Sequence, residues 1–463
     1  MLRMLRTLPL LTLATLPVLG GCGEEPRSHL ERIQAEGELV VATREAPTSY
    51  QRGSLGPTGP EYAMARRFAD QLGVQLRMEV FPGPEALFAA LDRREADLAA
   101  AALTRTEERA LSRPFGPAYQ YVSALVVHRG GVDMRPEDVG DLVGRRIGVV
   151  PGSSHVDFLE EARTNHPGLA WVEVEEATTE GLLRKVHSGE FDYTIMDSHE
   201  FQAARRYFPE LRAALDLSGP QPLAWALSKG ADGSLEQRVE DFFDTIKTDG
   251  SLARILDHHY AHIQEFDYVN VRSFMRQVEQ RLPRFQSLFE DAASHTDLDW
   301  RLLAATGYQE SHWRAGAISP TGVRGVMMLT QPTAKYVGVS RRTDPAQSIH
   351  GGARYLRVLK DRLADVPEPD RTWLALAAYN VGHGHLQDAR RITERQGGDP
   401  DAWVEVKKRL PLLRQKAWYT ETEYGYARGD EAVTYVENIR TYYDILRRLR
   451  GPEGDATTLA RAS

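Results

Sequence analysis

The first half of the chain alternates short apolar runs with segments whose apolar residues recur at helical spacing. Residues 37–43 (GELVVAT) predict a β-strand, residues 58–72 an amphipathic helix, residues 75–81 a second strand and residues 84–93 a second helix. The alternation returns further on, with strands expected at 146–150, 171–174 and 191–196, a helix opening at 152–154 and another over 179–188. This alternation of strands and helices predicts an α/β fold.

Two further apolar segments give this half its expected organisation. Residues 121–128 read as a strand that leaves the first group of elements, and residues 223–227 as a strand that returns to it. Two α/β lobes joined by two crossings enclose a cleft between them, which is a usual place for a small ligand.

The pattern changes after about residue 261. The segment 268–291 (YVNVRSFMRQVEQRLPRFQSLFED) has helical spacing without intervening strands, and the remainder reads as mainly α. Helices are expected at 272–282, 284–293, 298–312, 331–336, 346–364, 370–381, 384–396, 400–408 and 430–449. We therefore predict one domain over residues 36–265, a second over 266–450, and a flexible tail at 451–463.

The N-terminus reads as an export signal. Arg3 and Arg6 precede an apolar run from Leu8 to Val18, which is short for a membrane span and typical of a secretory signal. Cys22, the only cysteine of the 463 residues, follows Leu19-Gly20-Gly21, and this resembles a bacterial lipobox, although Gly20 is unusual at its position. We expect a signal peptide at 1–21, a lipidated Cys22 followed by a spacer to residue 35, and anchoring to the outer membrane facing the periplasm. The alternative is an ordinary signal peptide with an incidental cysteine.

Composition narrows the class of protein. Hydrophobic residues make up 42% and charged residues 26%, ordinary values for a folded globular chain. The formal net charge is −8, which disfavours a general nucleic-acid binder. We find no phosphate-cradling glycine loop and no metal-ligand cluster, and we interpret His258, His259 and His262 as surface or capping residues. We therefore expect no cofactor and no metal.

In the first domain, five segments in order are similar to the family 3 extracellular solute-binding proteins over residues 36–262. They are GELVVATREAP, TRTEERALSRPFGPAYQ, GRRIGVVPGSS, GEFDYTIMDSHEF and DGSLARILDHHY. The resemblance implies that Arg109 holds a ligand carboxylate and Asp197 its amino group, as suits an amino acid or a peptide end. Ser154, at an expected helix start, can present backbone N–H groups to an anion. The alternative is that Arg109 and Asp197 only form surface or ion-pair contacts.

In the second domain, Glu310 ends a predicted helix and precedes a loop rich in turn-forming residues. Thr296 or Asp297 can cap that helix, which we expect to begin at Leu298. Residues 303, 306 and 307 share the face of Glu310, so its carboxyl group is directed toward the packed side. Partial burial raises the pKa of a carboxyl group, as a general acid near neutral pH requires. The alternative is a helix-end glutamate that binds a loop N–H.

Four short motifs in order strengthen the catalytic interpretation. Glu310-Ser311, Gly325-Val326-Met327-Met328, Ala377-Ala378-Tyr379-Asn380 and residues 435–439 (YVENI) resemble those of the lytic transglycosylase domain of the lysozyme-like superfamily. Many members have Gly-Leu-Met-Gln at the second motif, so the role of Met328 is open. A solute-binding domain joined to such a domain occurs in one membrane-bound branch of these enzymes, and the Met-Met variant is in keeping with that branch. The resemblance implies that Ser311, Ser319, Met327, Tyr379, Asn380 and Tyr435 bind or orient the substrate or the acid.

The implied reaction cleaves the β-1,4 bond between N-acetylmuramic acid and N-acetylglucosamine in peptidoglycan and leaves a 1,6-anhydro end. A single acid suffices, because the C6 hydroxyl of muramic acid can replace the second carboxylate or water of an ordinary glycosidase. Acids such as Asp344 or Glu423 are nevertheless candidates to reach the cleft. Two alternatives stay open: a goose-type lysozyme-like hydrolase, and a lipid-anchored solute-binding or sensor protein that cleaves nothing. If the chain is a lytic transglycosylase, we expect its first domain to bind a muropeptide or amino acid and to regulate cleavage.

Overall fold

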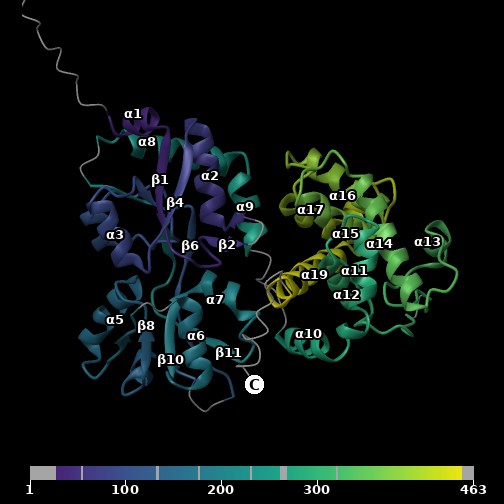
Figure 1. Cartoon of the computed structure of the whole chain (residues 1–463), viewed down its shortest axis with the longest axis horizontal. Coiled ribbons are helices and arrows are strands. Elements are labelled where there is room, and N and C mark those ends of the chain that lie inside the picture. Colours follow the sequence, from purple (N-terminus) through teal and green to yellow (C-terminus); the bar gives the residue numbers. More distant parts are fainter. Residues whose placement is uncertain are drawn as a thin grey trace, which may run out of the picture.

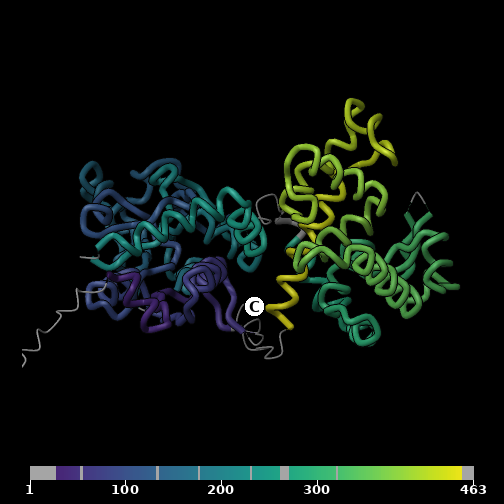
Figure 2. The backbone as a smooth tube through the Cα atoms, turned by 90° about the horizontal axis from the view of Figure 1, so that it is seen from above, coloured from purple at the N-terminus to yellow at the C-terminus, as the bar shows by residue number. Residues whose placement is uncertain are grey.

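Two bodies lie side by side in the computed structural model, an α/β body followed by a helical one (Figures 1 and 2). The structure describes residues 28–53, 56–131, 135–175, 178–229, 232–260, 268–319 and 322–450. The predicted signal peptide, Cys22, His262, the junction at 265–266 and the tail at 451–463 lie outside these ranges. Among the helices of the described residues, none combines the length and apolar character that a bilayer crossing needs.

The first lobe is built on a four-stranded sheet in the order β13-β5-β1-β4. β1 (Glu38–Thr43) pairs in parallel with β4 (Gln75–Val80) and β5 (Leu98–Ala99), whereas β13 (Ala226–Leu227) is antiparallel to β5. The helices of the lobe are α1 (His29–Glu36), α2 (Pro60–Leu72), α3 (Pro84–Asp92), α4 (Glu107–Ser112), α8 (Ser234–Thr248) and α9 (Ser251–His259), and β2 (Gln51–Gly53) and β3 (Gly56–Thr58) form a hairpin. Apolar side chains from this sheet and from helices α1, α2, α8 and α9 share one core, with Trp225 stacked on Phe242.

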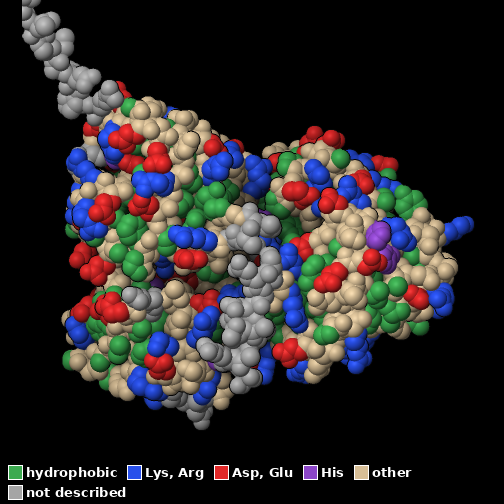
Figure 3. Space-filling model, in the orientation of Figure 1, with side chains coloured by type: hydrophobic (Ala, Val, Ile, Leu, Met, Phe, Trp, Pro, Cys, Tyr) green, Lys and Arg blue, Asp and Glu red, His purple; other side chains and the backbone are tan. Residues whose placement is uncertain are grey.

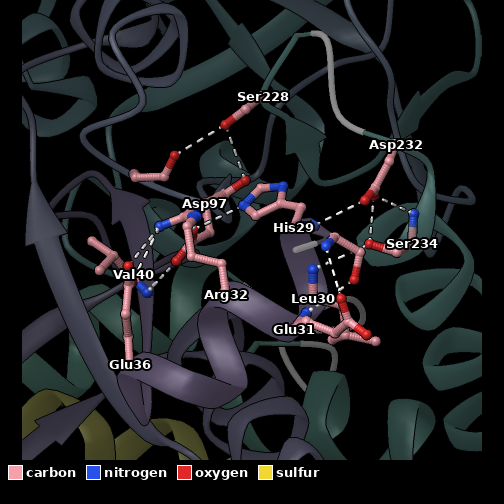
Figure 4. A network of polar contacts seen from close by, with 12 residues as sticks. His29, Leu30, Glu31, Arg32, Glu36, Val40, Asp97, Ser228, Asp232 and Ser234 are labelled. Carbon is pink, nitrogen blue, oxygen red and sulfur yellow. Dashed lines mark hydrogen bonds and ion pairs between the residues drawn. The ribbon is translucent and has the colours of Figure 1, made fainter. Parts of the chain in front are cut away.

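Figure 4 shows how α1 is fixed to the first lobe. The carboxylate of Asp97 accepts hydrogen bonds from the imidazole of His29 (2.9 Å), the guanidinium of Arg32 (2.8 Å) and the backbone N–H of Val40 at β1 (2.9 Å). Burial alone would raise the pKa of Asp97, but the bonds from His29 and Val40 outweigh it and hold that pKa below its usual range. The start of the described chain is therefore held against the sheet by a buried carboxylate.

The second lobe has a five-stranded sheet in the order β11-β7-β10-β8-β9. β8 is parallel to β9 and β10, and β7 is antiparallel to both β10 and β11. The predicted α/β class with two lobes is confirmed. The strands are β7 (Ala124–Arg129), β8 (Ile147–Val149), β9 (Val172–Glu173), β10 (Tyr193–Asp197) and β11 (Leu211–Asp216), and the helices are α5 (Ser154–Asn165), α6 (Thr179–Ser188) and α7 (Ser198–Arg205).

A two-stranded ribbon joins the lobes. β6 (Gln120–Val122) pairs antiparallel with β12 (Gln221–Leu223), and each continues into the sheet of a different lobe. The prediction of one unbroken strand at 121–128 and another at 223–227 is wrong, because each segment changes partners midway. At the first break, the backbone N–H of Ser123 turns to the hydroxyl of Ser198 (3.1 Å).

The second body is helical, and the described residues from 268 onward form no strand longer than an isolated bridge, so the predicted mainly α class is confirmed. One apolar core runs through it, and in that core Tyr308 of the central helix α12 packs in an aromatic cluster with Phe274, Trp313 and Tyr442. The helices are α10 (Tyr268–Gln280), α11 (Gln286–Ser294), α12 (Trp300–Ser311), α13 (Gln331–Tyr336), α14 (Pro345–Asp361), α15 (Asp370–Val381), α16 (His383–Arg395), α17 (Trp403–Arg409), α18 (Lys416–Tyr419) and α19 (Gly429–Leu449).

Helix α19 connects the helical body to both lobes, and Figures 1 and 2 show its yellow end reaching toward them. On the side of the first lobe, the buried carboxylate of Asp257 on α9 accepts hydrogen bonds from Arg440 (2.7 Å) and from Lys407. Burial would raise the pKa of Asp257, but the two cations outweigh it and lower that pKa. On the side of the second lobe, Arg206 donates to Asp444 (2.6 Å). Helix α19 is therefore attached to both lobes.

Candidate functional site

Glu310 is positioned by α12. This helix begins at Trp300, one residue after Asp299, whose carboxylate accepts a hydrogen bond from the backbone N–H of Arg301 (2.9 Å). The predicted start at Leu298 with Thr296 or Asp297 as the cap is wrong. Asp297 has a φ of 53°, in the left-handed region, and cannot occupy the extended conformation of an N-cap.

The face of α12 that carries Glu310 is packed. Leu303 and Thr306 are fully buried, and Gly307 lies where an added Cβ would meet Phe289 at 2.9 Å and the sulfur of Met327 at 3.3 Å. Met327 belongs to the loop that follows α12 in the sequence, so the loop lies directly against the helix one turn before Glu310. The side chain of Glu310 is consequently half-buried at the end of a packed face.

The carboxyl group of Glu310 has one hydrogen-bond partner among the described residues. Tyr435, on α19, donates its hydroxyl to Oε1 of Glu310 at 2.6 Å. Burial raises the pKa of Glu310 to about 7, and the Tyr435 hydrogen bond opposes that rise by favouring the carboxylate. A carboxyl group with such a pKa is protonated in a large fraction of molecules near neutral pH and can both give and take a proton.

Tyr379 lies on α15 and is hydrogen-bonded to the loop. Its hydroxyl donates to the backbone carbonyl of Met327 (2.9 Å), and burial together with the nearby Glu310 raises its pKa well above its ordinary value. The side chain of Met327 is fully buried. The side chain of Met327 is therefore not on the cleft surface in this structure, and its predicted binding or orienting role stays a prediction.

The loop carrying Gly325 to Met328 is held by groups on both sides. The hydroxyl of Ser311 donates to the carbonyl of Val326 (2.9 Å), and the hydroxyl of Ser348 on α14 accepts from the N–H of Met327 (3.1 Å). Ser311 is buried and orients the loop instead of facing the cleft. Met328 has a φ of 44°, a left-handed conformation that a side chain adopts at a cost, and it reverses the chain between Gly325 and Leu329.

Ser319 lies at the far end of the same loop. Its backbone exchanges hydrogen bonds with Val323 (3.0 Å) and Gly322 (3.0 Å), and its hydroxyl accepts from the N–H of Val323 (3.2 Å). These contacts bring the described residues Ser319, Gly322 and Val323 together in the predicted loop after α12. The predicted orienting role of Ser319 toward Glu310 stays a prediction.

An open cleft of about 350 Å³ lies beside Tyr435. Asn380 is exposed on it, as expected for a group that contacts substrate. The predicted candidates for a second acid do not line it: Asp344 caps α14, and Glu423 pairs with Arg391 (2.7 Å). The lining residues are Gln309, Asn380, Asp430, Glu431, Thr434 and Tyr435.

The two acids of the cleft were not anticipated, and both stand at the start of α19. Asp430 pairs with Arg414 (2.7 Å) through one oxygen, and its other oxygen is buried without a hydrogen-bond partner among the described residues. Glu431 pairs with Arg428 (3.1 Å). The sequence does offer a signal for them, because both acids lie in the first turn of the helix that carries the YVENI motif. Acids at a helix N-terminus are stabilised by the helix dipole, and they share a face with the residues one turn further on, which include Tyr435.

A second candidate site lies between the lobes of the α/β body. Arg44 follows β1 in the first lobe and forms an ion pair with Glu200 on α7 of the second lobe. Arg109 bridges the lobes too, donating to the carbonyls of Thr104 (3.1 Å) and Gly152 (2.9 Å). The cavity that remains between them, lined by Arg44, Ser153, His155 and Glu200 among others, holds only about 20 Å³. The lobes are thus closed on each other.

Asp197 and Ser154 lie near this cavity. Asp197, at the end of β10, contacts the imidazole of His155 (3.1 Å) and is buried. Burial alone would raise its pKa, but His155 outweighs that effect and lowers it. Ser154 is the first residue of α5, as predicted, but the neighbouring Ser153 lines the cavity. Within the part of the chain that the structure describes, the buried hydroxyl of Ser153 has no hydrogen-bond partner. Arg44, Glu200 and His155 were missed because nothing local in the sequence marks a contact between lobes.

Comparison with known families separates the chain into the same two parts, an α/β domain followed by a helical one. Residues 39–262 match the bacterial extracellular solute-binding proteins of family 3, and residues 287–401 match the transglycosylase SLT domain. Among solved structures, an ancestral amino acid-binding protein that is a precursor of cyclohexadienyl dehydratase is 22% identical, with a TM-score of 0.45, over 50% of this chain and 100% of that chain. The holo ArgBP structure from T. maritima is 22% identical, with a TM-score of 0.43, over 47% of this chain and 93% of that chain.

Relatives that span nearly the whole chain are more informative. Membrane-bound lytic murein transglycosylase F 1 of Alkalilimnicola ehrlichii is 50% identical over 92% of this chain and 87% of the relative. Membrane-bound lytic murein transglycosylase F of Ectopseudomonas mendocina is 45% identical over 97% and 93%, and that of Photobacterium profundum is 46% identical over 92% and 84%. The chain belongs to the family of the membrane-bound lytic murein transglycosylases F.

Proposed function

We propose that this chain is a peptidoglycan lytic transglycosylase in which Glu310 acts first as the acid and then as the base. The observation that carries the proposal is a half-buried carboxyl group with a pKa of about 7, hydrogen-bonded to one tyrosine beside an open cleft. Membership in a family named for this activity and the matched SLT domain support it. The substrate is the glycan strand of peptidoglycan in the cell envelope.

The reaction needs no water and no second catalytic carboxylate. Protonated Glu310 gives its proton to the glycosidic oxygen, and the bond from that oxygen to C1 of N-acetylmuramic acid breaks as N-acetylglucosamine leaves. The N-acetyl group of the substrate stabilises the cationic C1 centre. The C6 hydroxyl then attacks C1 and loses its proton to the carboxylate of Glu310, which closes the 1,6-anhydro ring and restores the acid.

The two tyrosines serve this cycle at different points. The hydroxyl of Tyr435 donates to the carboxylate of Glu310 and so stabilises the form that exists between the two proton transfers. Tyr379 donates to the carbonyl of Met327 and holds the loop against the end of α12. Asn380 and the acids at the start of α19 face the cleft and are placed to bind sugar hydroxyl and amide groups.

Digestion of purified peptidoglycan tests the reaction class. Mass spectrometry of the products should show 1,6-anhydromuramic ends. Reducing ends would instead support a goose-type lysozyme-like hydrolase, and intact glycan strands after prolonged incubation would support the solute-binding or sensor alternative.

Replacing Tyr435 with phenylalanine should shift the pH dependence of cleavage. The hydrogen bond from Tyr435 lowers the pKa of Glu310, so its loss raises that pKa, by about one to two units for a bond to a charged acceptor. The protonated acid then persists to higher pH. In a profile of kcat/KM against pH, the decline on the alkaline side should therefore move to higher pH. The rate at neutral pH should fall, because the carboxylate form of Glu310 is less stable without the hydrogen bond.

Tyr443→Phe is the matched control, because Tyr443 lies on the same helix and its hydroxyl donates to Asp299 (2.8 Å), the cap of α12. That variant should leave the alkaline decline in place. A Tyr435→Phe enzyme with an unchanged pH profile would reject the role of Tyr435 in stabilising the carboxylate of Glu310.

We further propose that the α/β body binds an amino acid or a peptide end of the cell wall, with Arg109 and Asp197 as its charged contacts. The match to the solute-binding family supports this class of ligand. Because the closed cavity holds only about 20 Å³, the Arg44–Glu200 pair and the Arg109–Gly152 bond must part to admit a ligand. The attachment of α19 to both lobes supports coupling of that movement to Tyr435, and through it to Glu310.

The Arg109→Ala variant should lose ligand binding at least about tenfold, since a guanidinium–carboxylate contact in a shielded site contributes about 1.5–3 kcal/mol. Calorimetric titration with L-amino acids and with stem peptides of peptidoglycan measures the loss. Arg105→Ala, an exposed arginine on the same segment, is the control. Equal affinity in both variants would reject the role of Arg109, and a bound ligand that changes neither cleavage rate nor lobe arrangement would reject regulation.

We propose finally that Cys22 carries the lipid that attaches the chain to the outer membrane. The lipobox-like sequence before it supports this placement. Mass spectrometry of the chain from bacterial membranes should show an acylated N-terminal cysteine, and a Cys22→Ala variant recovered from the same membranes at an equal level would contradict it.

A further inference from the structure

The outer surface of the helical body carries a group of side chains that the proposed chemistry does not use. Asp291 lies on α11, His295 follows the end of that helix one turn later, and His350 lies on α14, which packs against α11. Each offers a potential ligand atom, and these atoms all lie within 4.8 Å of one another. Figure 3 shows histidine side chains beside acidic ones over this part of the helical body.

The contact between Asp291 and His350 already has the spacing of two ligands on one ion. Nε2 of His350 lies 3.0 Å from Oδ2 of Asp291. Two ligand atoms at about 2.0–2.2 Å from a tetrahedral ion stand about 3.4 Å apart. Exchange of the shared proton for a metal ion therefore requires a movement of only a few tenths of an ångström.

The ring of His295 faces Asp291 with its Nδ1. That atom lies 2.7 Å from the backbone carbonyl of Asp291 and 3.8 Å from Oδ1 of the same residue. When Nδ1 donates to the carbonyl, Nε2 of the neutral ring keeps its lone pair, and an imidazole held in this way is the usual form of a metal-binding histidine. The side chain of His295 is 66% exposed, so the ring is free to turn and bring a nitrogen to an ion between Asp291 and His350.

We propose that Asp291, His295 and His350 bind a divalent transition metal ion of the Zn²⁺ class. Two imidazoles and one carboxylate suit Zn²⁺, whereas Ca²⁺ and Mg²⁺ take oxygen ligands. The side chains of Asp291 and His295 are 57% and 66% exposed, which gives the ion a path from solvent and leaves its fourth position to water.

Such an ion would join two helices that both contact residues next to Glu310. On α11, Phe289 lies against Gly307 of α12, one turn before Glu310. On α14, Ser348 binds the N–H of Met327, and Gly352 lies where an added Cβ would meet the side chain of Met327 at 2.6 Å. The ion therefore stabilises the framework of the helical body and takes no part in bond cleavage.

Isothermal titration of the purified chain with ZnCl₂ tests the proposal, using protein without a histidine tag that has been stripped with a chelator. We expect one site in the wild type and affinity at least about tenfold weaker in His350→Ala, because loss of even an outer partner of a metal ligand costs about 10–100-fold. His385→Ala, a histidine of the same body on α16, should bind zinc as the wild type does. Zinc at a hundredfold excess over Kd should raise the wild-type Tm by at least about 3 °C and leave that of His350→Ala unchanged.

Asp291→Asn and His295→Ala extend the test, and circular dichroism confirms their folding. The proposal is overturned if the wild type binds no zinc, or if folded His350→Ala and His295→Ala bind zinc as tightly as the wild type. The latter result would place the ion at other histidines of the chain.

Discussion

The Glu310→Gln variant should lose cleavage of peptidoglycan by a factor of about 10³ or more while keeping its fold. Glutamine fills the same space, but it cannot give a proton to the glycosidic oxygen or take one from the C6 hydroxyl, and each such transfer contributes about 10²–10⁴-fold. Release of soluble muropeptides from purified peptidoglycan measures the effect. Substantial activity in the variant would reject the assignment of Glu310 as the catalytic acid and base.

The stability of this variant provides an internal control, because burial raises the pKa of Glu310 to about 7. A carboxyl group whose pKa is raised on folding favours the folded state while it is protonated, and that contribution is lost as the pH rises through the folded pKa. Wild type should therefore lose stability relative to Glu310→Gln between pH 5 and pH 8. Denaturant unfolding at the two pH values measures the difference, and a difference that is the same at pH 5 and pH 8 would show that folding does not raise the pKa of Glu310.

The Gly325→Ala variant should lose both stability and activity, by on the order of 3 kcal/mol or more in the free energy of unfolding. Gly325 has a φ of 90°, which strains any other residue, and an added Cβ would lie 1.8 Å from the carbonyl oxygen of Arg342 and 2.6 Å from the hydroxyl of Ser348. The chain would have to move at both contacts, and Ser348 is the group that holds the N–H of Met327. Thermal and denaturant unfolding, together with the cleavage assay, measure the two losses.

Gly316→Ala is the matched control for that change, because Gly316 lies in the same segment after α12 and an added Cβ meets nothing within 4 Å. It should keep the stability of the wild type within about 0.5 kcal/mol. A Gly325→Ala variant as stable and active as Gly316→Ala would show that the loop conformation is not required for the site.

Most of the regular elements of the helical body can be predicted from the sequence because their apolar spacing is undisturbed. The predicted helix at 370–381 coincides with α15, and that at 331–336 with α13. The start of α12 is mispredicted because Thr296, Asp297 and Asp299 are all acceptable caps, and the choice among them depends on the left-handed turn at Asp297. Helix α8 was overlooked, although Leu235, Val239, Phe242 and Ile246 repeat at helical spacing and form part of the core.

In the candidate site, too, some residues can be predicted from the sequence and others cannot. Glu310 and Tyr435 lie in helices with recognisable patterns, so each can be proposed from its own segment. The supports of the loop cannot, because the pairing of Ser348 with Met327 and of Arg342 with the carbonyl of Leu329 (2.9 Å) depends on how the helices pack. The cluster of Asp291, His295 and His350 was missed for the same reason, since helices α12 and α13 and the loops around them separate its third member from the other two.

Cleavage of peptidoglycan in ¹⁸O-labelled water, with mass spectrometry of the products of the wild type and of Glu310→Gln, distinguishes intramolecular transfer by Glu310 from hydrolysis. The wild type should form 1,6-anhydromuramic ends that contain no ¹⁸O, and Glu310→Gln should form almost none. Reducing ends labelled with ¹⁸O, or anhydro ends formed by Glu310→Gln at the wild-type rate, would contradict intramolecular transfer by Glu310.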